Sequence, residues 1–183
     1  MLIKLVGHGG VGKLTIARAL APIVSGRLID NHTIYNPAFA VTEFRSHNFF
    51  ELVRRVRDLV FKQAASIPSN IPLIFTFAPG PDPVWDLEWD DAFAALASER
   101  QEPLLSITLT CSPEEHRKRI VSPTRALLSK LTSTHLIDAG LPPPTQDKCA
   151  DGTTTLDVTG MSADHAAENI ALWANAATGA YRP

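Results

Sequence analysis

The chain has 183 residues, 45% hydrophobic and 20% charged, which suits one globular domain with a sizeable core. A net charge of −2 gives no reason to expect nucleic acid or an anionic membrane as a partner. No apolar run approaches the roughly 20 residues that cross a bilayer, and the first residues do not resemble a signal peptide. Cys111 and Cys149 lack a metal-binding spacing and are expected to be reduced thiols. We therefore expect a cytoplasmic protein.

A glycine-rich segment, GHGGVGKLT at residues 7–15, follows an apolar run at residues 2–6 that predicts a buried strand. Residues 16–21 have the spacing of an amphipathic helix. This is the setting of a phosphate-binding loop, whose backbone N–H groups surround an anion at a helix N-terminus. Lys13 adds a full positive charge for the outer phosphates. The residues expected to bind a nucleotide are Gly7, Gly9, Gly10, Val11, Gly12, Lys13, Leu14 and Thr15.

The position after the lysine departs from the usual pattern, in which Ser or Thr holds a magnesium ion. Here that position is Leu14, which has no metal-binding atom, and Thr15 comes one place later. Thr15, or a water molecule held by it, is therefore the expected metal ligand on the loop. The pattern G-x-x-G-x-G-K-x-T is similar to the loop of nucleoside monophosphate kinases.

Further along the chain, strands are predicted at residues 26–30, 71–77, 104–109 and 153–158, of which 71–77 is a nearly continuous apolar run suited to a central parallel strand. Helices are expected from about 86 to 98, from Pro113, where Ser112 is the N-cap, and from 163 to about 176. Alternating strands and helices predict an α/β fold, with a parallel sheet covered on both faces. The alternation is interrupted at about 31–66 and 121–144. We expect one domain, 1–183, with the second interruption forming a flexible lid.

Residues 46–66 give the strongest helix prediction, because apolar residues recur at steps of three and four. The predicted buried stripe consists of Phe49, Val53, Val56, Val60 and Ala64, widened by Leu52 and Leu59. The polar face carries Arg54, Arg55, Arg57 and Lys62. On that face Arg54 and Arg57 are either solvated or hold a substrate anion between them.

With these elements in order, the chain resembles the superfamily of nucleoside monophosphate kinases and shikimate kinases. More narrowly, it is similar to small shikimate-kinase-like P-loop proteins of bacteria, also described as AAA-type ATPases. The resemblance rests on the loop, on IDNH after the second strand, on the IFTF strand, on the arginines around SPTR and on the closing LDVTGMS. It implies a three-layer α/β/α P-loop nucleoside triphosphate hydrolase fold with five parallel strands.

The resemblance also implies an ATP- and Mg²⁺-dependent kinase whose partners are a nucleotide and a small-molecule acceptor. The interruption at 31–66 would bind the acceptor. His32 replaces the second acid of the shikimate kinases' D-x-D motif, and their glycine triplet after the third strand is missing. Shikimate itself is therefore not expected as the acceptor.

Roles for single residues follow from the same resemblance. Lys13 and Asp30 would act on the transferred phosphoryl group and the acceptor hydroxyl, with Thr15 and Asp30 near the metal. The flap arginines expected to close on the phosphates are Arg119 and Arg125. The residues expected around the base are Arg117, Gly160 and Met161. The candidates for acceptor binding are Asp30, Asn31, His32, Arg54 and Arg57.

Two other functions stay open at this point. The order Lys13-Leu14-Thr15 is also typical of nucleoside and nucleotide kinases. A regulator that binds ATP and transfers nothing would explain Leu14 and the lost second acid. Asp30 itself has an alternative role as the N-cap of the segment that follows it.

Overall fold

A computed structural model describes residues 1–80, 82–121 and 147–179. Its five strands form one parallel sheet in the order β2-β3-β1-β4-β5, which confirms the predicted fold class. The strands are β1 (Leu2–Val6), β2 (Arg27–Ile29), β3 (Leu73–Phe77), β4 (Leu104–Thr110) and β5 (Gly152–Asp157). The helices are α1 (Lys13–Ile23), α2 (Asn31–Val41), α3 (His47–Ala65), α4 (Pro83–Arg100), α5 (Pro113–Ile120) and α8 (Ala163–Ala177).

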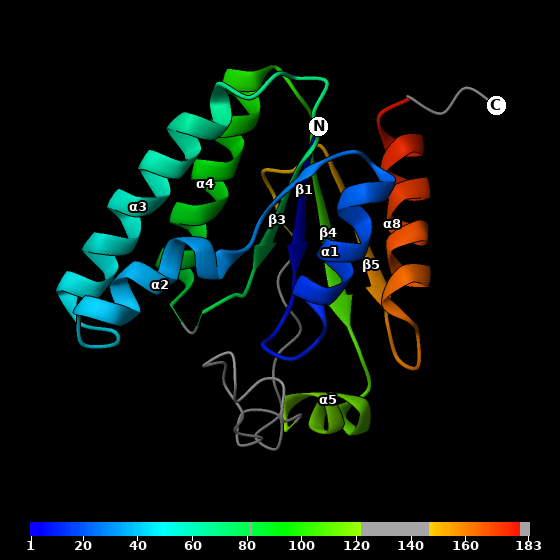
Figure 1. Cartoon of the computed structure of the whole chain (residues 1–183), viewed down its shortest axis with the longest axis horizontal. Coiled ribbons are helices and arrows are strands. Elements are labelled where there is room, and N and C mark those ends of the chain that lie inside the picture. Colours follow the sequence, from blue (N-terminus) through cyan, green and yellow to red (C-terminus); the bar gives the residue numbers. More distant parts are fainter. Residues whose placement is uncertain (81, 122–146, 180–183) are drawn as a thin grey trace.

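Helices cover both faces of the sheet, so the molecule has three layers (Figure 1). Helices α2, α3 and α4 lie on one side, where Leu2 and Val6 of β1 join an aromatic core. Helices α1 and α8 lie on the other side, where Ile3 and Leu5 are buried. Because successive side chains of a strand point to opposite faces, a central strand buried on both sides must be almost wholly apolar. The runs in β1 and β3 meet that requirement.

The parallel register brings the carboxyl ends of the strands to one edge of the sheet. Leu2 pairs with Leu73 on β3 and with Leu104 on β4. This edge faces downward in Figure 1, where the glycine-rich loop, the start of α2 and helix α5 lie. Open α/β sheets bind their ligands at this edge.

Helix α2 was not predicted from the sequence, because Pro37 lies inside it. Proline lacks an amide hydrogen, so the helix forgoes one internal bond there. The helix is stabilised instead by packing, with Ile34 and Ala38 buried against the core. Helix α4 also begins earlier than predicted, at Pro83, where Asp82 caps the Val84 amide at 2.9 Å. The predicted cap of α5, Ser112, is confirmed, and α3 begins after the predicted start at Ser46, whose side chain accepts from the Phe49 amide.

The predicted faces of α3 are wrong at two positions. Leu59, expected in the buried stripe, is 70% exposed. Arg57, expected on the polar face, is 9% exposed, and its guanidinium lies 5.3 Å from the centre of the Trp89 ring. The buried row of α3 therefore runs through Phe49, Val53, Arg57 and Phe61 toward the aromatic side chains of α4.

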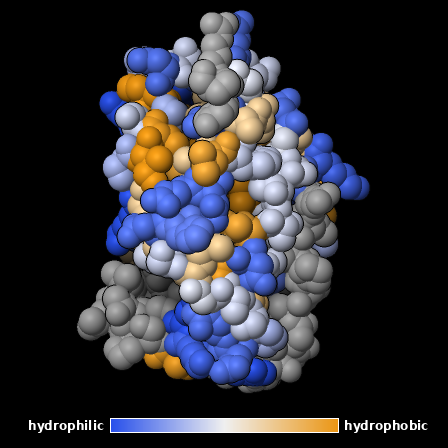
Figure 2. All heavy atoms as spheres, turned by 90° about the vertical axis from the view of Figure 1, so that its right-hand side faces the viewer, coloured by the Kyte–Doolittle hydropathy of each residue, from blue (hydrophilic) through white to orange (hydrophobic). Residues whose placement is uncertain are grey.

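The side formed by α1 and α8 shows a mixture of hydrophobic and hydrophilic residues (Figure 2). Leu172 of α8 is 57% exposed there. Among the described residues, none of the helices combines the length and apolar character needed to cross a membrane. Except for Val121, the predicted lid at 121–144 lies outside the described residues. Arg125 lies outside them as well.

Candidate functional site

The glycine-rich loop between β1 and α1 forms the centre of the candidate site. The Gly7 amide donates to the Phe77 carbonyl at 3.2 Å, so the loop leaves the sheet only after that residue. Gly10 and Gly12 have φ of 101° and 115°, values that residues with a Cβ rarely adopt. A turn closes inside the loop from the Val11 amide to the His8 carbonyl at 3.3 Å. The glycines thus permit the backbone path that a phosphate-binding loop requires.

Lys13 is the first residue of α1 and is 9% exposed. Its ammonium group donates to the carbonyl of Gly7 and, at 2.9 Å, to that of His8. The lysine therefore spans the loop that precedes it. Its ammonium group thus lies beside the backbone of the loop, where an anion bound by the loop amides would also lie.

Asp30 follows β2 and occupies the N-cap position of α2, but its side chain makes no cap hydrogen bond. Instead, its Oδ1 accepts a hydrogen bond of 2.5 Å from the hydroxyl of Thr76 in β3. The same hydroxyl accepts a bond of 3.0 Å from the amide of Asn31. Thr76 thus fixes the carboxylate at the carboxyl end of the sheet. Asp30 follows β2, which lies two positions from β1, the strand that precedes the loop. Capping does not explain the side chain of Asp30.

Asn31 and His32 form the first turn of α2, beside Asp30. The His32 Nδ1 lies 3.2 Å from Oδ1 of Asn36, one turn further along. Its ring centre is 6.2 Å from that of Phe39, which is 45% exposed. A row of partly exposed polar and aromatic groups therefore extends along α2 from the carboxylate.

Arg54 and Arg57 lie between α3 and α4. Arg54 contacts both carboxylate oxygens of Glu88, at 2.7 and 2.9 Å, and lies 5.0 Å from the Trp85 ring centre. The bond from Arg54 lowers the pKa of Glu88. Arg57 donates to Asp58 at 3.0 Å and stacks on Trp89. These contacts account for both arginines as packing groups between the two helices.

Helix α5 contacts the loop from outside through two side chains that sequence reasoning did not assign to the loop. His116 is 6% exposed, and its Nε2 lies 2.7 Å from the Gly9 carbonyl. Arg119 donates to the Val11 carbonyl at 2.8 Å and to the Val158 carbonyl at 2.9 Å. The predicted closure of Arg119 on the phosphates would require these bonds to be exchanged.

The residues expected around the base lie at the end of β5 and on α5. The Ser112 amide donates to the Thr159 hydroxyl at 2.7 Å, which ties the segment before α5 to the one after β5. Gly160 is exposed with φ of 65°, and Met161 packs partly against the core. Arg117 is exposed on α5. The structure thus brings Gly160 and Met161 to the same edge as the loop.

The groups available for a metal ion suit magnesium held by phosphates. The described residues contain no group of three or more His, Cys, Asp and Glu side chains that could hold an ion alone. Magnesium keeps several water ligands and uses one or two carboxylates together with phosphate oxygens. The carboxylate of Asp30, which makes no cap hydrogen bond, and the exposed Thr15 fit such a role. Leu14 does not, because its side chain has no metal-binding atom.

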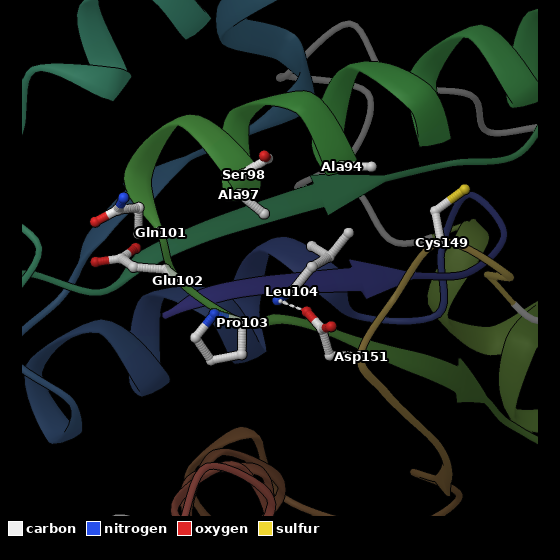
Figure 3. Close-up of a pocket in the computed structure, with 9 residues that line it drawn as sticks. All are labelled: Ala94, Ala97, Ser98, Gln101, Glu102, Pro103, Leu104, Cys149 and Asp151. Atoms are coloured by element: carbon white, nitrogen blue, oxygen red, sulfur yellow. Dashed lines mark hydrogen bonds between the residues drawn. The ribbon is translucent and has the colours of Figure 1, made fainter.

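A groove of about 580 Å³ lies away from the loop, between the end of α4 and the segment before β5 (Figure 3). Its lining includes Gln101, Glu102 and Leu104, which precede or begin β4, together with Cys149 and Asp151. The Asp151 carboxylate there accepts the Leu104 amide at 2.8 Å. Because these residues lie at the amino ends of the strands, the groove is separate from the candidate site.

Comparison with solved structures identifies the fold. A candidate kinase from Chloroflexus aurantiacus superposes with a TM-score of 0.65 at 19% identity, covering 97% of both chains. Shikimate kinase from Acinetobacter baumannii, in complex with shikimate, gives 0.61 at 18% identity over 96% of this chain and 93% of that one. The APS kinase CysC of Mycobacterium tuberculosis, in complex with AMPPNP and APS, gives 0.56 at 13% over 95% and 96%.

No protein-family model matches the sequence, and no curated protein is similar to it at the sequence level. At these identities the likeness is one of fold. The chain has the three-layer fold of P-loop small-molecule kinases over nearly its whole length.

Proposed function

We propose that the protein is an ATP-dependent kinase that transfers the γ-phosphoryl group to a hydroxyl of a small molecule. The observation that carries the proposal is the carboxylate of Asp30, which faces Thr76 and does not cap the helix that it precedes. It lies at the sheet edge where the glycine-rich loop and Lys13 also lie. The kinase fold of the solved neighbours supports the same assignment.

In this mechanism the loop amides and the N-terminus of α1 bind the β- and γ-phosphates. Lys13 exchanges its carbonyl partners for phosphate oxygens and stabilises the charge that shifts during transfer. The acceptor oxygen bonds to the γ-phosphorus as the bond to the β–γ bridging oxygen breaks, and ADP leaves. Asp30 orients the acceptor hydroxyl and takes its proton late in the step. Asp30 and Thr15 are the residues that would hold a phosphate-bound magnesium ion, which would neutralise part of the phosphate charge.

The first experiment measures ATP binding by calorimetry in the wild type and in Lys13→Ala. Binding that disappears in the variant supports the nucleotide site. Absence of ATP and GTP binding by the wild type would overturn the proposal.

The second experiment measures ADP release with ATP and a panel of acceptors: nucleosides, nucleotides, sugars, and aminoglycoside- or phenicol-type alcohols. Asp30→Asn should remove turnover and retain ATP affinity, because the amide cannot take the proton. Tight ATP binding without ADP release above background for any acceptor would favour a regulator that binds nucleotide. Turnover restricted to nucleosides or nucleotides would favour the corresponding kinases.

A further inference from the structure

Two side chains of α5 contact backbone carbonyl groups of the glycine-rich loop. His116 and Arg119 are three residues apart, so they lie on one face of the helix. His116 contacts the Gly9 carbonyl at 2.7 Å, and Arg119 donates to the Val11 carbonyl at 2.8 Å. The two contacted carbonyls are thus two residues apart in the loop.

The geometry of the peptide bond gives these contacts a consequence for the opposite side of the loop. In a trans peptide the carbonyl of one residue and the amide hydrogen of the next point in opposite directions. The described residues contain no cis peptide bonds. A carbonyl of Gly9 held toward α5 therefore turns the Gly10 amide away from α5. The Val11 carbonyl does the same for the amide of Gly12.

Both side chains are held firmly enough to impose this orientation. The His116 ring is 6% exposed and fills the space beside Gly10, where a Cβ would lie 3.1 Å from its Cδ2 and Nε2 atoms. Arg119 is held further by Glu115 at 2.8 Å and by the Val158 carbonyl at 2.9 Å. The loop is therefore buttressed from outside by groups that bind its carbonyls.

We propose that His116 and Arg119 are positioning residues for nucleotide phosphates. They orient the amides of Gly10 and Gly12 toward the phosphate side of the loop before nucleotide arrives, so less ordering remains for binding. His116 must carry a proton on Nε2 to donate to Gly9, which both the Nε2–H tautomer and the imidazolium satisfy. The inference rests on the proposed function, since it concerns how that site binds a triphosphate.

The test compares two amide substitutions at His116 that differ in reach. In His116→Gln the terminal amide nitrogen occupies about the place of Nε2 and can donate to Gly9. In His116→Asn the amide is as polar but too short to reach. Affinity for ATP and for inorganic tripolyphosphate is measured by calorimetry, and urea unfolding verifies that both variants are folded.

We expect His116→Asn to weaken both ligands roughly 5- to 30-fold, the loss typical of a buried hydrogen bond. His116→Gln should stay within about three-fold of the wild type, a difference below one hydrogen bond. Lys118→Gln is the matched control, because Lys118 lies on the same helix, is 67% exposed and pairs with Glu114. This control should bind both ligands like the wild type.

Equal affinities of the Asn and Gln variants for tripolyphosphate would overturn the inference, whether both fell or neither did. Should the Asn variant unfold, the proposal is tested in Arg119→Lys by NMR, through the backbone amide resonances of Gly10 and Gly12 compared with the wild type. A lysine reaches one carbonyl where the guanidinium reaches two, so the Gly12 resonance should shift, and an unchanged one contradicts the proposal. Failure of the wild type to bind any triphosphate would reject the nucleotide function itself, which is a separate result.

Discussion

A lysine buried in the central strand provides the sharpest test of what stabilises this fold. Lys4 of β1 is 1% exposed, and its ammonium group bonds to Asp90 of α4 and to Asp147 at 2.8 Å. It also lies 4.9 and 4.8 Å from the ring centres of Phe77 and Phe93. Replacing it with methionine keeps the length of the side chain and removes the charge. Two carboxylates, with 19% and 2% of their side chains exposed, then face each other without a cation.

Removing one partner of a buried ion pair costs about 3–5 kcal/mol, because it leaves an uncompensated charge. We expect Lys4→Met to lose an amount of that size near pH 8, against a total of about 5–15 kcal/mol for a typical domain. For a chain of this length the loss lowers Tm by roughly 6–20 °C. Urea unfolding of wild type and variant measures it as a shift of midpoint at constant slope.

The loss should shrink as the pH falls. Burial raises the pKa of Asp90, and Lys4 opposes that shift, so removing the lysine raises this pKa further. A carboxyl whose folded pKa exceeds its unfolded value stabilises the fold when protonated, and that contribution is lost as pH rises through the folded value. The difference between variant and wild type should therefore be smaller at pH 5 than at pH 8. A loss under about 1 kcal/mol, or one equal at both pH values, would contradict this role of Lys4.

Three further predictions concern single contacts. Arg100→Met should cost about 3–5 kcal/mol in urea unfolding, because the arginine donates to the carbonyls of Ala64, at the end of α3, and of Ile71, before β3; a smaller loss would mean that water replaces it. Thr76→Val should lower kcat roughly ten-fold or more at unchanged ATP affinity, since Asp30 loses its fixed orientation; unchanged kcat contradicts this. Glu88→Gln should cost under about 1 kcal/mol at pH 7, the pair being partly exposed. Because Arg54 lowers the pKa of that carboxyl, the difference from wild type should shrink as the pH falls through the lowered pKa, and a constant difference would exclude the ion pair as its cause.

The parts of the fold that the sequence predicted are those whose cause is local. The strand–glycine–helix order of residues 2–21 needs neighbouring residues alone, and the structure has it as predicted. Ser112 and Pro113 begin α5 for a reason contained within one turn. Strand β3 is also a local signal, because it is a nearly continuous apolar run of suitable length.

The parts that were missed depend on partners far along the chain. Arg57 is buried because Trp89 of α4 stacks on it, a contact that the spacing within α3 cannot reveal. Pro37 argues against a helix, and only packing against the core overrides it. His116 lies 107 residues from Gly9, so no pattern links the two. The sequence offered only a histidine three residues before Arg119, on the helix that follows β4.

The bonds that the arginines make bear on how this site would attract anions. Arg119 is bonded to two carbonyls and a carboxylate, and Arg54 is bonded through two nitrogens to Glu88. A substrate anion between Arg54 and Arg57 would have to displace the Glu88 carboxylate. The cost of breaking that ion pair would weaken the binding of the anion. The contacts of Arg54 and Arg57 therefore favour their role as packing groups between α3 and α4 over the binding of an acceptor anion.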